Sequence, residues 1–380
     1  MPINKLFLTE SYYILKSYFE MDILLNIYTK KRSGFMKSRL ILTLAVLIVF
    51  MSIVFVSCKK DEKALPAEKG IFAGADYLPQ DSAFFLSADW ASISKIEAFE
   101  KEINEMKEEI KGEVGIDVFE GLEAISMAVM DFDTKDFEQS AIVVLKGSFD
   151  KDSILQAIRS QEDITDILET EYEKTAIYTP QDNKGSDMSL AFMGQDTVLL
   201  SGIEMIKKAV DVKHKKVPSI NSNKTIAEAL KGIKKGSQIY GVGIVDQQMK
   251  DSIAKDPMSA SFAAIDIFTL ALLFDTGKYE VNFTGRASTQ EDAKQIVNTL
   301  NGFWEGMAKP MLMGEPQYAE FADILKIDLK GTDAVINITI TEEQIEKIKN
   351  LAPGIGQEDG EAELSEEYED EDMQGESYPQ

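Results

Sequence analysis

Apolar residues recur along this chain with two different spacings, and the switch between them predicts a mixed fold. Residues 81–89, DSAFFLSAD, form an apolar run between acidic ends, which is typical of a β-strand. Between Ile93 and Ile110 apolar residues recur at every third or fourth position, which predicts an amphipathic helix that begins at a capping box of Ser94 and Glu97. This region therefore contains both strands and helices.

The rest of the first half continues this alternation. Two β-rich runs, 125–133 and 140–149, flank a polar turn at 134–138 and predict a hairpin, and a helix is expected to begin at Asp150. Three further strands and a helix are expected near residues 175–178, 188–192, 197–201 and 203–212, with Ser201 and Glu204 as the capping box of the helix.

The second half repeats this order of elements. Its expected strands lie at 236–244, 268–277, 279–288, 324–329 and 334–340. Two helices are expected, one from Ser288 with Glu291 as its capping partner and one from Thr341 with Gln344 at that position. Because several elements match in one order, we infer an internal duplication and an α+β fold, in which antiparallel strand meanders are covered by helices.

These patterns predict an organisation in six segments. Residues 1–35 look like an upstream extension from a misassigned start codon, because Met36 already begins a complete secretory signal. The remaining segments are a signal peptide at 36–57, a tether at 58–75, α+β repeat units at 76–217 and 218–352, and an acidic, disordered tail at 353–380.

The segment from Met36 to Cys58 has the layout of a secretory signal. Lys37 and Arg39 precede an apolar run over 40–56, and Ser57 and Cys58 follow it. The stretch FVSC resembles the lipobox of bacterial lipoproteins, with Phe55 where that family usually has Leu. The resemblance implies cleavage between Ser57 and Cys58 and acylation of Cys58. Acyl chains on this sulfur would hold the protein on a membrane, since each buried methylene contributes about 0.8 kcal/mol.

An uncleaved membrane anchor is the alternative interpretation of the same segment. The apolar run has 17 residues, which is at the short end of what crosses a bilayer. Both interpretations place the body outside the cytoplasm, because the basic residues before the run stay inside. We therefore expect a lipid-anchored protein of the cell envelope. In a Gram-negative organism, Lys59 after the cysteine resembles the signal for passage to the outer membrane, facing the periplasm.

The net charge limits the classes of partner that the folded part is expected to bind. The formal charge is −25, and the first 57 residues carry seven basic and three acidic side chains, which leaves −29 from Cys58 onward. Such a surface repels phosphate, so nucleic acid is not an expected partner, whereas the charge permits basic proteins and divalent cations. The expected location in the envelope makes an envelope protein a candidate partner. A single cysteine allows no intramolecular disulfide, so the fold depends on packing.

The candidate chemistry is sparse, and we expect no catalytic residue, cofactor or metal. The one histidine, His214, lies in KHKK and is expected to be a solvated residue of a link. The stretch 131–136, DFDTKD, begins like a calcium loop but lacks the required Gly and Glu, so it is expected to be a hairpin turn. The stretch GVGIVD at Gly241 lacks the third glycine of a dinucleotide site and is expected to be a strand whose glycines permit close packing.

The segment from Ser189 to Gly243 resembles one found in exported bacterial proteins of unknown function. There a strand hairpin leads to a helix, a short polar link, a second helix and a new strand. That resemblance implies a fold and no activity. The leading hypothesis is a membrane-anchored, non-catalytic binding or structural protein whose ligand is unknown. The alternatives are a carrier with a hydrophobic ligand in a cavity between sheet and helices, and a carboxylate-dependent hydrolase.

Overall fold

A computed structural model describes residues 73–96, 100–131, 137–182, 188–257, 259–275 and 277–351. The predicted signal peptide with Ser57 and Cys58, nearly all of the tether, the acidic tail and most of the DFDTKD stretch lie outside these residues.

The first half of the body contains seven strands among its described residues. They are β1 (Phe84–Ala88), β2 (Leu122–Val129), β3 (Ala141–Gly147), β4 (Ile164–Tyr172), β5 (Thr175–Asp182), β6 (Met188–Phe192) and β7 (Thr197–Gly202). The helical elements of this half are η1 (Ala75–Tyr77), α4 (Trp90–Ile93), α5 (Glu100–Val114), α6 (Phe137–Ser140), α7 (Lys151–Arg159) and α8 (Ile203–Lys213).

The second half contributes five strands in the described ranges. They are β8 (Ile239–Ile244), β9 (Ile265–Asp275), β10 (Lys278–Ala287), β11 (Leu325–Lys330) and β12 (Asp333–Thr341). The helical elements are η3 (Ile220–Ser222), α9 (Lys224–Leu230), α10 (Gln247–Ile253), η4 (Ala260–Ala264), α11 (Gln290–Phe303), the π-helical η5 (Trp304–Ala308), α12 (Lys309–Gly314), η6 (Ala319–Asp323) and α13 (Glu342–Leu351).

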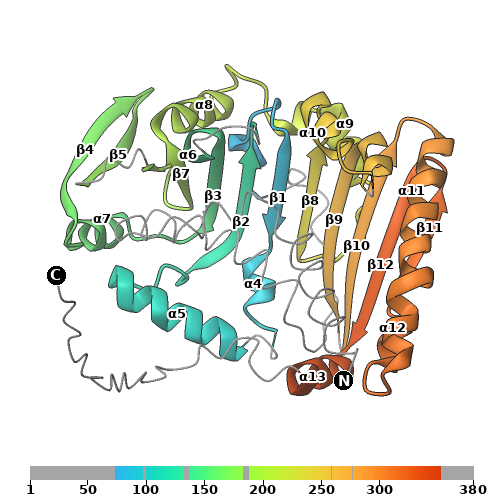
Figure 1. The fold of residues 1–380 in the computed structure, drawn as a ribbon. Helices are drawn as coiled ribbons and strands as arrows, with labels where there is room; N and C mark the ends of the chain where they lie inside the picture. The colour runs from blue at the N-terminus through green and yellow to red at the C-terminus, as the bar shows by residue number, and fades with distance from the viewer. Residues whose placement is uncertain are drawn as a thin grey trace, which may run out of the picture.

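All of these strands belong to one antiparallel sheet. In the described part of the chain the strand order is β11-β12-β10-β9-β8-β1-β2-β3-β7-β6-β5-β4, so β4 and β11 are the edges (Figure 1). The two halves meet where β1 pairs with β8, with Phe84 opposite Gly243 and Ala88 opposite Ile239. The structure therefore confirms the α+β class and shows that both halves share a single sheet.

The two halves follow the same order of elements outward from the β1–β8 pair. β1, β2 and β3 are successive neighbours on one side, as β8, β9 and β10 are on the other. β7 lies next to β3 and is followed by α8, whereas β12 lies next to β10 and is followed by α13. The β4–β5 hairpin extends the first half further. The predicted repeat units, as products of a duplication, stay a prediction.

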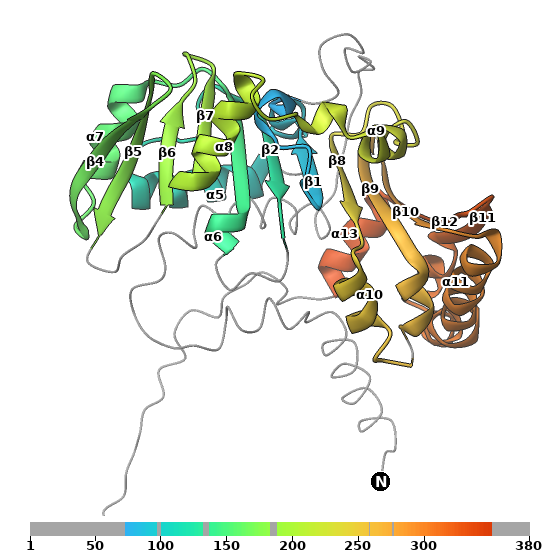
Figure 2. The same ribbon diagram turned by 90° about the horizontal axis from the view of Figure 1, so that it is seen from above.

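Helices cover both faces of the sheet. We name one face the α5 face, where Leu86, Met127 and Val143 pack with apolar residues of α5. The opposite α8 face carries Phe85 and Ile142, which pack with α8 and α9. In the second half, α10, α11 and α13 lie on one side of β9, β10 and β12, and α9 lies on the other (Figure 2).

A row of hydroxyl groups crosses the α8 face where the two halves meet. Ser87 of β1 lies directly opposite Tyr240 of β8 on one side and Ser126 of β2 on the other. The Ser87 and Ser126 hydroxyl oxygens are 3.0 Å apart, and Ser126 donates a hydrogen bond to the carbonyl of Ala73. Burial raises the pKa of Tyr240 to about 12, although a hydrogen bond with Ser87 opposes this rise.

The predicted caps of α7 and α13 are confirmed, whereas that of α11 is displaced by one residue. The Asp150 side chain accepts hydrogen bonds from the first turn of α7. At α13 the capping box is reciprocal, since the Thr341 amide donates to Gln344 Oε1 at 3.0 Å and the Gln344 amide donates to Thr341 Oγ1 at 3.3 Å. α11 begins one residue later than predicted, with Thr289 accepting from the Asp292 amide at 3.1 Å.

Three predicted capping boxes are wrong. The box of Ser288 and Glu291 is one of them, because Thr289 caps α11. Ser94 ends the short helix α4, which Asp89 caps, and α5 begins separately at Glu100. Ser201 does not cap α8, because its buried hydroxyl donates a hydrogen bond to the Ala141 carbonyl of β3. Strand β4 was not predicted, because charged residues are mixed with apolar ones along it. This mixture follows from the place of β4 at a solvated edge of the sheet.

The glycines of β8 permit close packing, as predicted. A Cβ on Gly241 would lie 2.8 Å from the Phe85 carbonyl oxygen, and a Cβ on Gly243 would lie 2.2 Å from Cζ of Phe268. The Phe268 ring stacks between Phe84 and Phe283, with centroid distances of 6.1 and 6.0 Å. The ring is therefore held against the Gly243 backbone from two sides.

Replacing Gly243 with Ala should lower the free energy of unfolding by about 1–3 kcal/mol, because the new methyl overlaps the Phe268 ring. Urea unfolding followed by tryptophan fluorescence measures this change. Gly112→Ala in α5 is the matched control, since nothing lies within 4 Å of its Cβ position, and it should stabilise by about 0.5–1 kcal/mol. Equal stability of the Gly243→Ala and wild-type proteins would contradict the packing argument.

Stability should also fall in alkaline solution because of Tyr240. Its pKa of about 12 in the folded protein exceeds the ordinary 10, so the phenol ionises first in the unfolded chain. The stabilisation from this group is complete below pH 10 and is lost as the pH rises through about 12, by up to about 3 kcal/mol. Urea unfolding from pH 9 to 12 should show a smaller loss for Tyr240→Phe than for wild type, with Tyr318→Phe as the control. Identical slopes in all three proteins would show that Tyr240 is not responsible.

Candidate functional site

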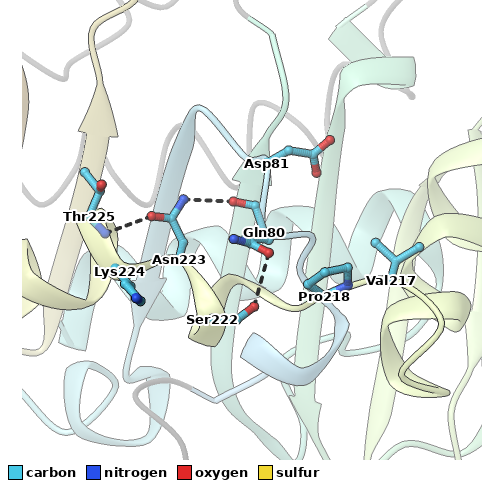
Figure 3. A pocket seen from close by; sticks show the side chains of 8 residues that line it. All are labelled: Gln80, Asp81, Val217, Pro218, Ser222, Asn223, Lys224 and Thr225. Atoms are coloured by element: carbon cyan, nitrogen blue, oxygen red, sulfur yellow. Dashed lines mark hydrogen bonds between the residues drawn. The ribbon is translucent and has the colours of Figure 1, made fainter.

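A hollow of about 660 Å³ lies where the chain passes from the first half to the second. Its walls come from the residues before β1 and from the link between α8 and α9 (Figure 3). The lining residues are Gln80, Asp81, Val217, Pro218, Ser222, Asn223, Lys224 and Thr225.

Asn223 organises this hollow. Its Oδ1 accepts hydrogen bonds from the amides of Thr225 and Ile226 at 3.0 and 3.1 Å and so caps α9. Its Nδ2 donates to the Gln80 carbonyl at 2.9 Å, and Ser222 donates to Gln80 Oε1 at 3.4 Å (Figure 3). One side chain therefore joins the start of α9 to the segment before β1.

Backbone pairing holds the same two segments together. The Gln80 amide donates to the Pro218 carbonyl at 3.0 Å, and the Ile220 amide donates to the Leu78 carbonyl at 2.8 Å. Pro79 and Ser219 form an isolated antiparallel bridge. These contacts give the walls of the hollow a structural role, because they join the link between the halves to β1.

The residues that line the hollow offer few groups for catalysis or for binding an apolar ligand. Most of its side chains are polar, whereas the cavity of a hydrophobic-ligand carrier is mainly apolar. Its one carboxylate, Asp81, pairs with Lys208 at 2.9 Å, whereas glycoside hydrolysis needs two carboxylates about 5–9.5 Å apart. The lining of the hollow thus favours neither a hydrophobic-ligand carrier nor a carboxylate-dependent hydrolase.

A lysine-rich segment covers the α8 face beside this hollow. Residues 205–236, here named the lysine segment, hold nine lysines and only two acidic residues, Asp211 and Glu228, within a strongly acidic protein. They include nearly all of α8, η3 and α9, which pack on the α8 face. The net charge of the whole chain does not show this local excess of lysine. A count of charged residues over a window of about 30 residues would have shown it.

The lysine segment is held by acids from the rest of the body. Its ion pairs with acids outside the segment include Lys207–Glu204 at 2.7 Å, Lys208–Asp81 at 2.9 Å, Lys213–Asp76 at 3.4 Å, Lys216–Glu173 at 2.7 Å and Lys234–Glu280. The hydrogen bond to Glu173 raises the pKa of Lys216. Each exposed pair contributes only about 0–1 kcal/mol, but together they join both halves to the link.

The folded body begins with residues that the sequence assigned to the tether. Ala75 and Leu78 are fully buried, and a Cβ on Gly74 would overlap Val144. Tyr77 lies between two ammonium groups, with Lys213 Nζ at 4.6 Å and Lys146 Nζ at 5.6 Å from its ring centroid. Gly74 and Ala75, which the sequence assigned to the tether, are therefore buried with Tyr77 and Leu78, and the described chain begins beside the lysine segment.

The structure places few of the residues singled out in the sequence. His214 is exposed at the C-terminal end of α8, as expected. The described residues include no group of three or more His, Cys, Asp or Glu side chains that could hold a metal ion. Among the same residues, every helix is too short or too polar to span a bilayer.

The sequence motifs did not indicate one feature of the structure, an exposed apolar surface. Of the large apolar side chains in the described ranges, five are exposed, and four of these lie at the end of α11, in η5 and in α12. We name Phe303, Met307, Met311 and Met313 the α11–α12 apolar surface. Phe303, Met307 and Met311 recur at every fourth position, which is a helical spacing, whereas Met313 lies only two residues after Met311 and faces another side of the helix. The spacing alone does not show which side of a helix faces the core.

Comparison with known families identifies the chain. A family model described as a protein of unknown function, DUF3352, matches residues 40–293. The chain belongs to this family. The match includes the apolar run, Ser57 and Cys58, together with the body as far as the beginning of α11. No curated protein matches this DUF3352 chain.

Solved structures of TP0453 are similar to this DUF3352 protein. Crystal form I has a TM-score of 0.40 at 12% identity, and the similarity covers 73% of this chain and 97% of TP0453. Crystal form III has a TM-score of 0.41 at 11% identity, with 75% and 100% covered. This similarity is too low to carry an argument about function.

Asn223→Ala should lower the free energy of unfolding by about 1–2 kcal/mol, because it removes the cap of α9 as well as the bond to Gln80. Asn223→Asp is the control, since it keeps the capping oxygen and replaces the amide donor with a carboxylate oxygen that cannot donate to the Gln80 carbonyl. Urea unfolding should therefore rank the Asp variant between Ala and wild type. An Asp variant as unstable as the Ala variant would show that capping is not the main contribution.

Proposed function

We propose that this DUF3352 protein is a lipoprotein of the cell envelope, which an acylated Cys58 holds at a membrane while its body performs non-catalytic binding or structural work. The observation that carries the proposal is the sequence from Lys37 to Cys58, in which basic residues, an apolar run and FVSC follow in order. The family match supports it, because most of this stretch belongs to the region shared with the DUF3352 family.

The start of the folded body agrees with such an anchor. The described residues begin at Ala73, which accepts a hydrogen bond from Ser126, and Ala75 is fully buried. The segment 59–72 has 14 residues and would span at most about 50 Å if fully extended. A lipid on Cys58 would thus keep the sheet near the membrane surface, where the body could meet an envelope protein.

Cys58→Ala should abolish acylation and signal cleavage, because no sulfur remains to carry the lipid. Mass spectrometry of the membrane fraction should find an acylated N-terminal peptide that begins at Cys58 in wild type and no such peptide in the variant. Ser52→Ala, in the same apolar run, is the matched control and should be processed normally. A wild-type peptide from residues 36–57, or an unmodified Cys58 thiol in the mature protein, would refute the proposal.

A further inference from the structure

Strand β4 is one edge of the sheet (Figure 1), and the turn that leads to β5 decides which of its backbone groups point outward. This turn has two residues, both with positive φ, 50° and 64°. Such a turn is flanked by a hydrogen-bonded pair, here Tyr172 and Thr175. Hydrogen-bonded and non-hydrogen-bonded pairs alternate along an antiparallel ladder. The N–H and C=O groups of Ile167, Glu169 and Glu171, here named the β4 edge, therefore point away from β5.

Two contacts at Ile167 agree with this assignment. Its partner on β5 is Pro180, which has no N–H to donate and therefore fits a pair without hydrogen bonds. The Ile167 amide instead donates to Oδ1 of the preceding residue, Asp166, at 2.7 Å. The outward backbone groups of Glu169 and Glu171 are open to a further strand, since β4 is the last strand of the sheet in the described chain.

The surroundings of this edge are strongly acidic. Residues 160–173 hold six acidic side chains and no basic one. Glu173 pairs with a lysine of the lysine segment at 2.7 Å. The Tyr178 hydroxyl and, to a lesser extent, Glu169 raise the pKa of Lys151 on α7. These two lysines offset only part of the six negative charges, so the edge keeps an excess of acid.

Side chains alternate between the two faces of β4. Ile167 packs with apolar residues of α7, so Glu169 and Glu171 lie on the face that α7 covers. Leu168 lies on the opposite face, and its exposed fraction is 54%. A strand that paired with this edge would therefore meet two carboxylates on one face and an apolar side chain on the other.

We propose, on the basis of the binding role inferred above for the body, that the β4 edge binds an extended, basic segment of a partner protein as an added strand. Main-chain hydrogen bonds to Glu169 and Glu171 hold such a segment in register. Its Lys or Arg side chains lie opposite these two carboxylates, and an apolar side chain at an adjacent position lies against Leu168.

The same charges disfavour a second copy of this strand as the occupant. Two β4 edges side by side would bring acid against acid, which is destabilising. Charged side chains commonly keep edge strands from pairing with their own kind. On this edge they also select a partner of opposite sign.

Fluorescence polarisation of labelled peptides on the full chain tests the proposal. The probe is a nine-residue peptide of alternating lysine and valine, which should bind and weaken as salt is added. A peptide with glutamate in place of lysine should not bind. N-methylation of the lysine amides, which would face β4, should weaken binding by at least about tenfold. N-methylation of the valine amides is the matched control and should leave binding unchanged.

Variants of the protein separate the charge from the backbone. Glu171→Gln removes one carboxylate and should weaken binding about threefold. Glu171→Pro also removes an outward N–H, keeps the ladder with β5, and should weaken binding about a further tenfold with an unchanged circular dichroism spectrum. Asp328→Asn loses the same charge on β11, at the other edge, and should bind like wild type.

Hydrogen exchange locates the contact. The lysine peptide should slow exchange of the Glu169 and Glu171 amides and leave the amides of Leu168 and Thr170, which already face β5, unchanged. A Cys58→Ala chain should bind the peptide like wild type, because the edge does not depend on the lipid. Failed acylation would therefore refute the lipoprotein and leave the peptide result standing.

Three results would overturn the proposed strand pairing. The first is equal binding of the two N-methylated peptides, which would show attraction between charges without a strand. The second is an Asp328→Asn protein that loses as much affinity as Glu171→Gln. The third is a peptide-free chain that sediments as a dimer and becomes monomeric in Glu171→Pro, which would assign the edge to a second copy.

Discussion

The antiparallel pairing of β1 with β8 is the interaction on which the rest of the structure depends. It joins two sets of strands into one sheet, so that only β4 and β11 remain as edges in the described chain. Close packing across this pair requires Gly241 and Gly243, which lie against the Phe85 backbone and the Phe268 ring. Without the pairing each half would expose another row of unpaired backbone groups, which invites aggregation.

Electrostatic contacts reinforce the same junction from the α8 face. The lysine segment links the halves, and its ammonium groups pair with acids before β1, at the β4–β5 turn and on β10. Tyr77 between Lys213 and Lys146 fastens the beginning of the body to this layer. Several lysines of this segment therefore pair with acids of the surrounding body. The α11–α12 apolar surface lies elsewhere, beside the β11 edge (Figure 1).

Much of the fold follows from short-range patterns, but the candidate sites do not. Alternating and helical periods predicted the hairpin of β2 and β3, the helix after Asp150 and the capping box of Thr341 and Gln344, because these depend on neighbours within a few residues. The hollow around Asn223 and the apolar surface around Met307 had no such signal, since each depends on which residues the folded chain leaves uncovered.

By itself the sequence determined the α+β class, the succession of strands and helices, and the layout that leads to Cys58, because local periodicity and composition encode these features. Only the tertiary structure decided that the halves share one sheet, that Ser201 bonds to Ala141 rather than capping α8, and which acids pair with the lysine segment. The reason is physical: pairs such as Phe84 and Gly243 lie far apart along the chain, and only packing of the whole molecule brings such partners together.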